Sequence, residues 1–305
     1  MLLSLRSGID SEIGWALDRL CRLCDNEQFL LRAIPGLTDA LFEWPEWYAS
    51  GTDGNHLDLP SLFAPSVDVS RKQRHAFESL FILRNAALNE PNALELANHP
   101  RTLPLIFKAL YNRKGDTDQN AEFILHVIEL LQAVSFKVTL SYFPTSPYDN
   151  PIPPLQEIAS QSSNRSLIIA SLTALTLILS NSSHASHLIP NSPAFIASIR
   201  YLPLFVDKPL VSACINYLYV HLSHPPIAKA FLLHPDMPAT LKLLVGVLLE
   251  EQVVETVSLD VSETIHTAPA LQLASRDHEL TKEELDDLLP KPEPQRCYEW
   301  YQFSS

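Results

Sequence analysis

Residues 174–179 read Ala174-Leu175-Thr176-Leu177-Ile178-Leu179, and a similar segment, Ile215-Asn216-Tyr217-Leu218-Tyr219, begins 41 residues later. Each is followed by the same layout: a short apolar segment, a proline turn and a further apolar segment. The spacing of apolar residues in these segments is helical rather than alternating, and strand-like alternation is almost absent from the chain. The sequence therefore contains an internal repeat made of helices.

The same layout occurs at other positions. A unit that begins at Ile82 starts 92 residues before Ala174, which is two periods, and a weaker unit lies between them. A period near 41 residues is within the roughly 40–47 residues that armadillo and HEAT repeats require. We predict an all-α, armadillo/HEAT-like superhelical solenoid of about five helical repeats over residues 1–249. The five segments are 16–42, 82–106, 123–158, 174–196 and 215–241.

The first interval is longer than one period, because it holds a loop insertion at about residues 45–70. Proline marks the steps between the other helices, and this explains how 24 prolines occur in a helical chain of 305 residues. The steps contain Pro35, Pro100, Pro190, Pro225 and Pro235. With only 7 glycines, the chain has little material for the glycine-rich loops that bind phosphates or nucleotides.

Negative charge is concentrated at the C-terminal end. The formal net charge is -13, of which -9 belongs to residues 250–305 and -4 to residues 1–249. We expect 250–305 to be a partly disordered acidic tail with one short helix, begun by Thr281 as N-cap. The tail ends in the aromatic segment Tyr298–Phe303, which we expect to dock on this chain or on another.

No membrane or secretory segment is expected. The most apolar stretch, Leu167–Leu179, has 13 residues, whereas a transmembrane helix needs about 20. The N-terminus reaches polar residues too early for a signal peptide. We therefore expect a soluble intracellular protein in which this stretch is a buried helix.

Residues that could carry chemistry do not form a known site. Cys21-x-x-Cys24 lies within a helical period and has no second ligand pair, so we interpret it as core packing. The pairs His184/His187 and His221/His224 lack a third metal ligand. Nucleophile-elbow and phosphate-loop motifs are absent from the sequence. We expect no enzymatic activity, and no metal, cofactor or small-molecule ligand.

Two basic clusters, at residues 71–75 and around residues 113–114, lack the interleaved aromatic residues of a nucleic-acid surface. We do not expect direct DNA binding by this region. Aromatic residues cluster instead in Trp44-Pro45-Glu46-Trp47-Tyr48 and near the C-terminus. The first cluster is a core plug or a partner anchor, and we consider Trp44, Trp47, Trp300 and Tyr301 as partner-binding residues.

Two segments carry a resemblance to a known family. Leu3–Leu17 resembles the segment that opens the armadillo region of the AT-rich-interaction-domain subunit of RSC/PBAF-type SWI/SNF chromatin remodelers. Ile82-Leu83-Arg84-Asn85-Ala86-Ala87 and the following Asn89–Asn92 are similar to the family's Ile-Leu-Arg-Asn-Leu-Ser signature and its next step. The paralogous large subunit of the other SWI/SNF class has a similar Arg-Asn signature, so that alternative stays open.

The resemblance covers about residues 3–249 and implies a nuclear, non-catalytic scaffold that holds neighbouring remodeler subunits and serves transcription regulation. Arg84 and Asn85, polar interruptions of an apolar helix, are the partner-binding residues we consider first; the alternative is a structural ion pair and hydrogen bond. The family's DNA-binding domains have no counterpart here, so we expect the chain to be a fragment. The alternative function is a peptide-binding armadillo adaptor in transport or signalling.

Overall fold

The computed structural model describes residues 1–26, 28–51, 67–113, 118–140, 147–232 and 242. Within these ranges the chain is helical and has no β-strand, so the predicted all-α class is confirmed there. None of the helices in these ranges is both long and apolar enough to cross a bilayer. The chain forms two compact units, residues 1–197 (unit 1) and residues 198–305 (unit 2).

The described helices of unit 1 include both long helices and short ones. They are α1 (Leu2–Leu5), α2 (Asp10–Leu23), η1 (Leu31–Ala33), α3 (Leu37–Ala49), α4 (Val67–Ala86), α5 (Glu90–Asn98), α6 (Thr102–Tyr111), α7 (Asp118–Val134), η3 (Ser135–Lys137), η4 (Pro147–Asp149), α8 (Ile152–Gln161), α9 (Arg165–Leu179) and η5 (Ser182–His187). Helix α10 (Pro193–Tyr201) contains the boundary between the two units.

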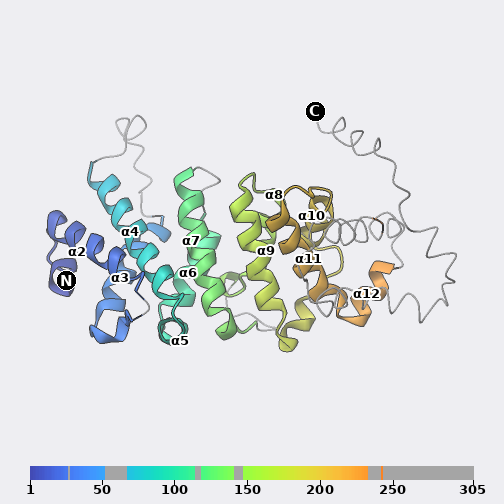
Figure 1. Ribbon diagram of the computed structural model, residues 1–305, viewed down its shortest axis with the longest axis horizontal. Helices are drawn as coiled ribbons and strands as arrows, with labels where there is room; N and C mark the ends of the chain where they lie inside the picture. The colour runs from blue at the N-terminus through green and yellow to red at the C-terminus, as the bar shows by residue number, and fades with distance from the viewer. Residues whose placement is uncertain (27, 52–66, 114–117, 141–146, 233–241, 243–305) are drawn as a thin grey trace, which may run out of the picture. The chain divides into compact units, whose positions relative to one another are not determined.

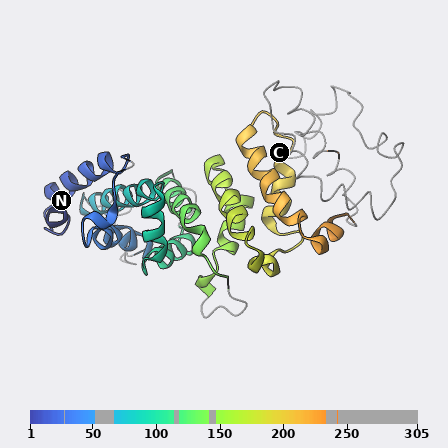
Figure 2. The same cartoon turned by 60° about the horizontal axis from the view of Figure 1, so that its bottom comes forward.

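The long helices of unit 1 form two rows. In one row, α2 packs on α4, α4 on α7, and α7 on α9; in the other, α3 packs on α6 and α6 on α8. The rows are joined because α3 packs on α4, α6 on α7, and α8 on α9. Figure 1 shows α4, α7 and α9 side by side in chain order, and the turned view in Figure 2 shows the same succession.

Helix α9 shows why these segments fold in this way. Its buried face consists of apolar side chains at helical spacing, including Leu172 and Leu175, which are fully buried. At its start, the Asn164 side chain accepts hydrogen bonds from the first free backbone N–H groups. The predicted buried helix at 167–179 is confirmed, and its burial against α7 and α8 is the main stabilising contribution.

The predicted limits of the loop insertion were wrong at both ends. Helix α3 continues through Pro45 to Ala49, and α4 begins at Val67; residues 52–66 lie outside the described residues. Pro45 has no N–H to donate to the carbonyl four residues earlier, which normally ends a helix. The helix continues because Pro45 is buried and the aromatic side chains next to it pack on α4.

Of the five prolines predicted at steps, Pro35, Pro100, Pro190 and Pro225 lie at helix boundaries, and Pro235 lies outside the described residues. Pro100 lies between α5 and α6, Pro190 precedes α10, and Pro225 is the first residue of α12. Because proline lacks an N–H, the first turn of a helix is the position that tolerates it best.

Unit 2 contains α11 (Lys208–Leu222) and α12 (Pro225–Leu232), which pack on each other. The Asp207 side chain accepts a hydrogen bond from the Leu210 N–H at the start of α11. The end of the fifth predicted repeat and the acidic tail 250–305, with the predicted short helix at Thr281 and the aromatic segment Tyr298–Phe303, lie outside the described residues.

Candidate interaction surface

Arg84 and Asn85 lie near the end of α4 and point to different neighbours. Asn85 is buried, and its amide nitrogen lies 3.2 Å from Asp25 Oδ1, just after α2. Arg84 is half-buried: its Nη1 donates to Asn85 Oδ1 (2.6 Å), and its Nε lies 2.8 Å from Glu129 Oε2 on α7. The dipeptide thus connects α4 to the segment that follows α2 and to helix α7.

The same line of polar contacts continues across α7. Glu129 Oε2 also lies 3.2 Å from Nδ1 of His126, and Gln132 Nε2 donates to the Ala170 carbonyl of α9 at 2.8 Å. Polar contacts therefore run from the end of α2 through α4 and α7 to α9. Arg84 and Glu129 keep 27% and 26% of their side-chain surface exposed, so this line lies at the protein surface.

Asn92 has a structural role that the sequence analysis missed. It lies at 1% exposure in α5, within the Asn89–Asn92 part of the family-like motif. Its Oδ1 accepts from the Leu31 N–H (2.9 Å), and its Nδ2 donates to the carbonyls of Phe29 (2.7 Å) and Ala86 (3.1 Å). The signal that points to it is a polar residue beside the apolar positions Ala93 and Leu96 of the same helix.

The aromatic cluster at residues 44–48 belongs to α3 and packs inward. The Trp44 ring meets His75 edge-on at 5.3 Å, and the Tyr48 ring lies 5.4 Å from Phe77 and 4.4 Å from Phe123. Lys72 Nζ lies 5.8 Å from the centre of the Trp47 ring. Both tryptophans keep some exposure, so their contact with a partner stays a prediction, as it does for Arg84 and Asn85. Trp300 and Tyr301 lie outside the described residues.

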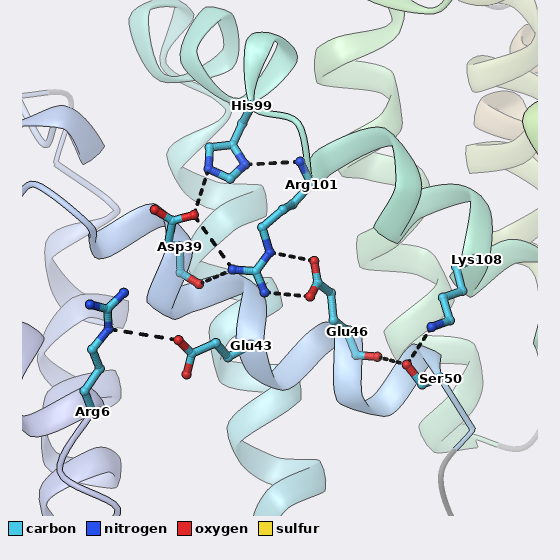
Figure 3. A network of polar contacts seen from close by, with 8 residues as sticks. All are labelled: Arg6, Asp39, Glu43, Glu46, Ser50, His99, Arg101 and Lys108. Carbon is cyan, nitrogen blue, oxygen red and sulfur yellow. Dashed lines mark hydrogen bonds and ion pairs between the residues drawn. The ribbon is translucent and has the colours of Figure 1, made fainter.

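A second polar network joins α3 to α6 in the other row (Figure 3). Arg101, at the start of α6, forms a two-pronged ion pair with Glu46: Nε–Oε1 is 2.8 Å and Nη2–Oε2 is 2.6 Å. Its Nη1 donates to the Asp39 carbonyl at 2.9 Å, and its guanidinium lies 5.7 Å from the Phe42 ring. The hydrogen bonds to Glu46 raise the pKa of Arg101, which stays protonated.

The same network extends to both ends of α3. Glu43 lies 4.0 Å from Arg6, and Lys108 Nζ donates to Ser50 Oγ at 2.8 Å (Figure 3). His99, which stacks on Phe42, lies 3.3 Å from Asp39. The contacts made by His99, Arg101 and Lys108 join residues about 55 to 62 positions apart in sequence, so they fix how α6 lies on α3.

Three arginines of the two basic clusters have acidic partners in the described residues. Arg71 pairs with Asp10 at 2.8 Å, Arg74 with Glu78 at 2.8 Å, and Arg113 with Glu157 at 2.7 Å. A surface that binds a phosphate backbone needs cations that are free to replace counterions. The pairing shows that much of this positive charge is balanced within the chain.

The cysteine and histidine side chains that the sequence analysis considered lie in buried or hydrogen-bonded positions. Burial raises the pKa of the Cys21 thiol to about 12 and that of the Cys24 thiol to about 11, so both are protonated at neutral pH and poor nucleophiles. The rings of His184 and His221 contact the backbone carbonyls of Ile178 and Tyr217. Within the described ranges, no group of three or more His, Cys, Asp and Glu residues is placed to hold a metal ion.

The chain is similar in sequence to a subunit of a multi-protein complex. Over 300 residues it is 21% identical to the chromatin structure-remodeling complex subunit rsc9 of Schizosaccharomyces pombe, and the alignment covers 98% of the chain and 36% of that relative. The chain thus spans little more than a third of the relative's length. No model of a known protein family matches the chain. The similarity supports the relation to a chromatin-remodeler subunit that the two motifs implied.

Proposed function

We propose that this chain is a non-catalytic scaffold subunit of an ATP-dependent chromatin-remodeling complex, located in the nucleus. The observation that carries the proposal is the similarity, over 98% of the chain, to a subunit of a chromatin structure-remodeling complex. Because a subunit works within an assembly, the proposed partners are other subunits of a SWI/SNF-family remodeler of the RSC/PBAF type.

The proposed means is an armadillo-like solenoid of about five repeats over residues 1–249. In support, α3, α4, α6 and α7 of unit 1 each pack on a helix of the other row and on the next helix of their own row. Proteins in which each unit contacts only its neighbours present long surfaces to their partners. The family-like motif contributes to this arrangement, because Asn85 and Asn92 hold the segment after α2 and Arg84 contacts α7.

Two observations favour a scaffold over the other functions considered. A peptide adaptor that reads basic segments needs a ladder of unpaired carboxylates, but Glu78 pairs with Arg74 and Glu129 with Arg84. A DNA-binding surface needs free cations, and Arg71, Arg74 and Arg113 of the basic clusters have acidic partners. We therefore expect no measurable affinity for duplex DNA at low salt; strong binding that falls steeply with salt would contradict this.

Affinity purification tests the proposal. The full chain, tagged at one end in one experiment and at the other end in a second, is purified from nuclear extract, and co-purifying proteins are identified by mass spectrometry. We expect the ATPase and core subunits of one remodeler in both preparations. Recovery of the chain without remodeler subunits from either preparation would overturn the assignment.

A further inference from the structure

In unit 2, the chain turns between the end of α10 and the start of α11. We name residues 200–209 the 200–209 corner. Two successive turns shape it: the Leu204 N–H donates to the Tyr201 carbonyl at 3.0 Å, and the Asp207 N–H donates to the Leu204 carbonyl at 2.9 Å. Leu204, which the two turns share, is 39% exposed, and Val206 is fully exposed. The corner is therefore a hydrogen-bonded surface that presents apolar side chains to its surroundings.

The exposed charges of this corner are positive. Arg200 and Lys208 are exposed near its two ends, and Arg200 has no ion-pair partner among the described residues. The one acid of the corner, Asp207, accepts a hydrogen bond from the Leu210 N–H and so caps α11. Residues 198–232 as a whole contain three basic residues and one acidic residue. This part of unit 2 therefore carries a net positive charge.

The acidic tail belongs to the same unit. Residues 250–305 contain 13 acids and 4 bases, and the acids are densest in residues 283–289, Glu-Glu-Leu-Asp-Asp-Leu-Leu, which lie outside the described residues. This segment combines four carboxylates with three leucines at positions i, i+3 and i+4. In the helix that the sequence predicts from Thr281, such leucines share one side. The segment thus complements the corner in charge and offers it apolar side chains.

The chain is long enough to bring the two together. Glu283 lies 51 positions after Leu232, the last residue of α12, and α12 packs on α11. An extended chain spans up to about 3.3–3.6 Å per residue, whereas the 15 residues of α11 span only about 22 Å. Because both parts belong to one chain, the segment also has a higher effective concentration at the corner than a separate partner would have.

We propose that residues 283–289 bind the 200–209 corner within the same chain. The leucines of the segment pack on Leu204 and Val206. Its carboxylates lie beside Arg200 and Lys208, where they balance the positive charge of the corner. The contact occupies this surface, so another protein can use the corner only by displacing the segment. The proposal goes beyond the proposed function and does not depend on it, because it concerns a single chain by itself.

Photo-crosslinking of the purified full chain tests the proposal. A photoreactive amino acid replaces Val206 in one preparation and Asn216, an exposed residue of α11 beyond the corner, in the matched control. Ordinary and isotope-labelled chains are mixed, so that mass spectrometry separates adducts within one chain from adducts between copies. We expect position 206 to form adducts with residues 283–289 of its own chain, and position 216 to form none with them. Adducts between copies, adducts with another segment, or no adduct at position 206 would overturn the proposal.

Charge variants measure the ionic part of the same contact. Arg200→Glu should lower the yield of the adduct from position 206 about threefold or more at low salt, because it places a carboxylate beside the acidic segment. Lys229→Glu makes the same change of charge on α12, outside the corner, and should leave the yield nearly unchanged. Both side chains are exposed, so the thermal midpoint should stay the same in both variants. An unchanged yield in Arg200→Glu, or equal losses in the two variants, would contradict the proposal.

Discussion

Different interactions connect the helices in the N-terminal and the C-terminal parts of the described chain. In the helices up to α6, charged side chains link neighbouring helices, as in the pairs of Arg101 with Glu46 and of Arg71 with Asp10. In α9 and α11, by contrast, residues 166–199 and 209–228 contain no Asp, Glu, Lys or Arg. We call these the charged region and the uncharged region.

Stability and helix orientation are expected to come from different interactions in the two regions. Partly exposed ion pairs contribute little free energy but fix the relative orientation of helices. Burial of apolar side chains contributes more and has no directional requirement. In the charged region, ion pairs such as Arg101 with Glu46 orient neighbouring helices, while the uncharged region leaves apolar side chains such as Leu177 exposed.

The largest effect is expected from a cavity in the uncharged region. Leu175 on α9 is fully buried, so Leu175→Ala should lower the free energy of unfolding by about 2–5 kcal/mol. Leu177→Ala, on the exposed side of the same helix, should change it by less than about 0.5 kcal/mol. Urea unfolding curves measure both. Similar losses in the two variants would contradict the packing of α9 described above.

The second effect is a loss of folding stability at acidic pH, caused by His221. Burial lowers the pKa of His221 on α11 from 6.5 to about 4, and the neighbouring His224 acts in the same direction. At neutral pH the imidazole is uncharged in both states. As the pH falls from about 6.5 to 4, the unfolded state takes up a proton that the folded state does not, so stability should decrease by about 3 kcal/mol.

Hydrogen exchange of α11 amides between pH 7 and pH 4, compared with His221→Gln, measures this loss. The stability of His221→Gln should decrease by about 3 kcal/mol less than that of the unmodified chain as the pH falls. An identical decrease in the variant and the unmodified chain would refute the prediction. His75 in the charged region is the useful contrast. Burial lowers its pKa too, but Glu78 and Asp10 act in the opposite direction.

The third effect tests the buried amide of the charged region. Asn92→Ala leaves the Leu31 N–H and the Phe29 carbonyl without this partner, which should cost about 2 kcal/mol. Asn98→Ala, at the exposed end of the same helix, should cost less than about 0.5 kcal/mol. Thermal unfolding compares the two. Equal losses of stability in the two variants would show that Asn92 does not stabilise the contact of α5 with residues 29–31.

The smallest effect is expected from the ion pair of α6 with α3. Arg101 and Glu46 are about a third exposed, so solvent screens them, and a double-mutant cycle with Arg101→Gln and Glu46→Gln should give a coupling of about 1 kcal/mol that decreases with salt. The fully surface pair of Arg22 with Asp18 should give less than about 0.5 kcal/mol. A coupling that is independent of salt would remove the contrast between the regions.

Local sequence signals predicted the helices well because they act over a few residues. Apolar spacing located α9, and the prolines located most helix boundaries. The same signals failed at Pro45, where the local rule favours a helix end. There, contacts of Trp44 and Tyr48 with residues of α4 and α7 outweigh the missing hydrogen bond.

The candidate surface was less predictable. Arg84 and Asn85 stand out as polar residues in an apolar helix, but their partners Glu129 and Asp25 are 45 and 60 residues away. Sequence spacing contains no information about such pairs. The importance of Asn92 was missed for the same reason, because its partners at Phe29 and Leu31 belong to a different layer.

By itself, the sequence determined the helical class, the positions of most helices and the separation of charge along the chain, because these depend on residue type and local spacing. Only the tertiary structure decided which polar residues connect layers, that α3 continues through Pro45, and that the polar groups of α7 and α9 donate within the chain. Those outcomes depend on contacts between distant residues, and such contacts exist only when the helices are packed.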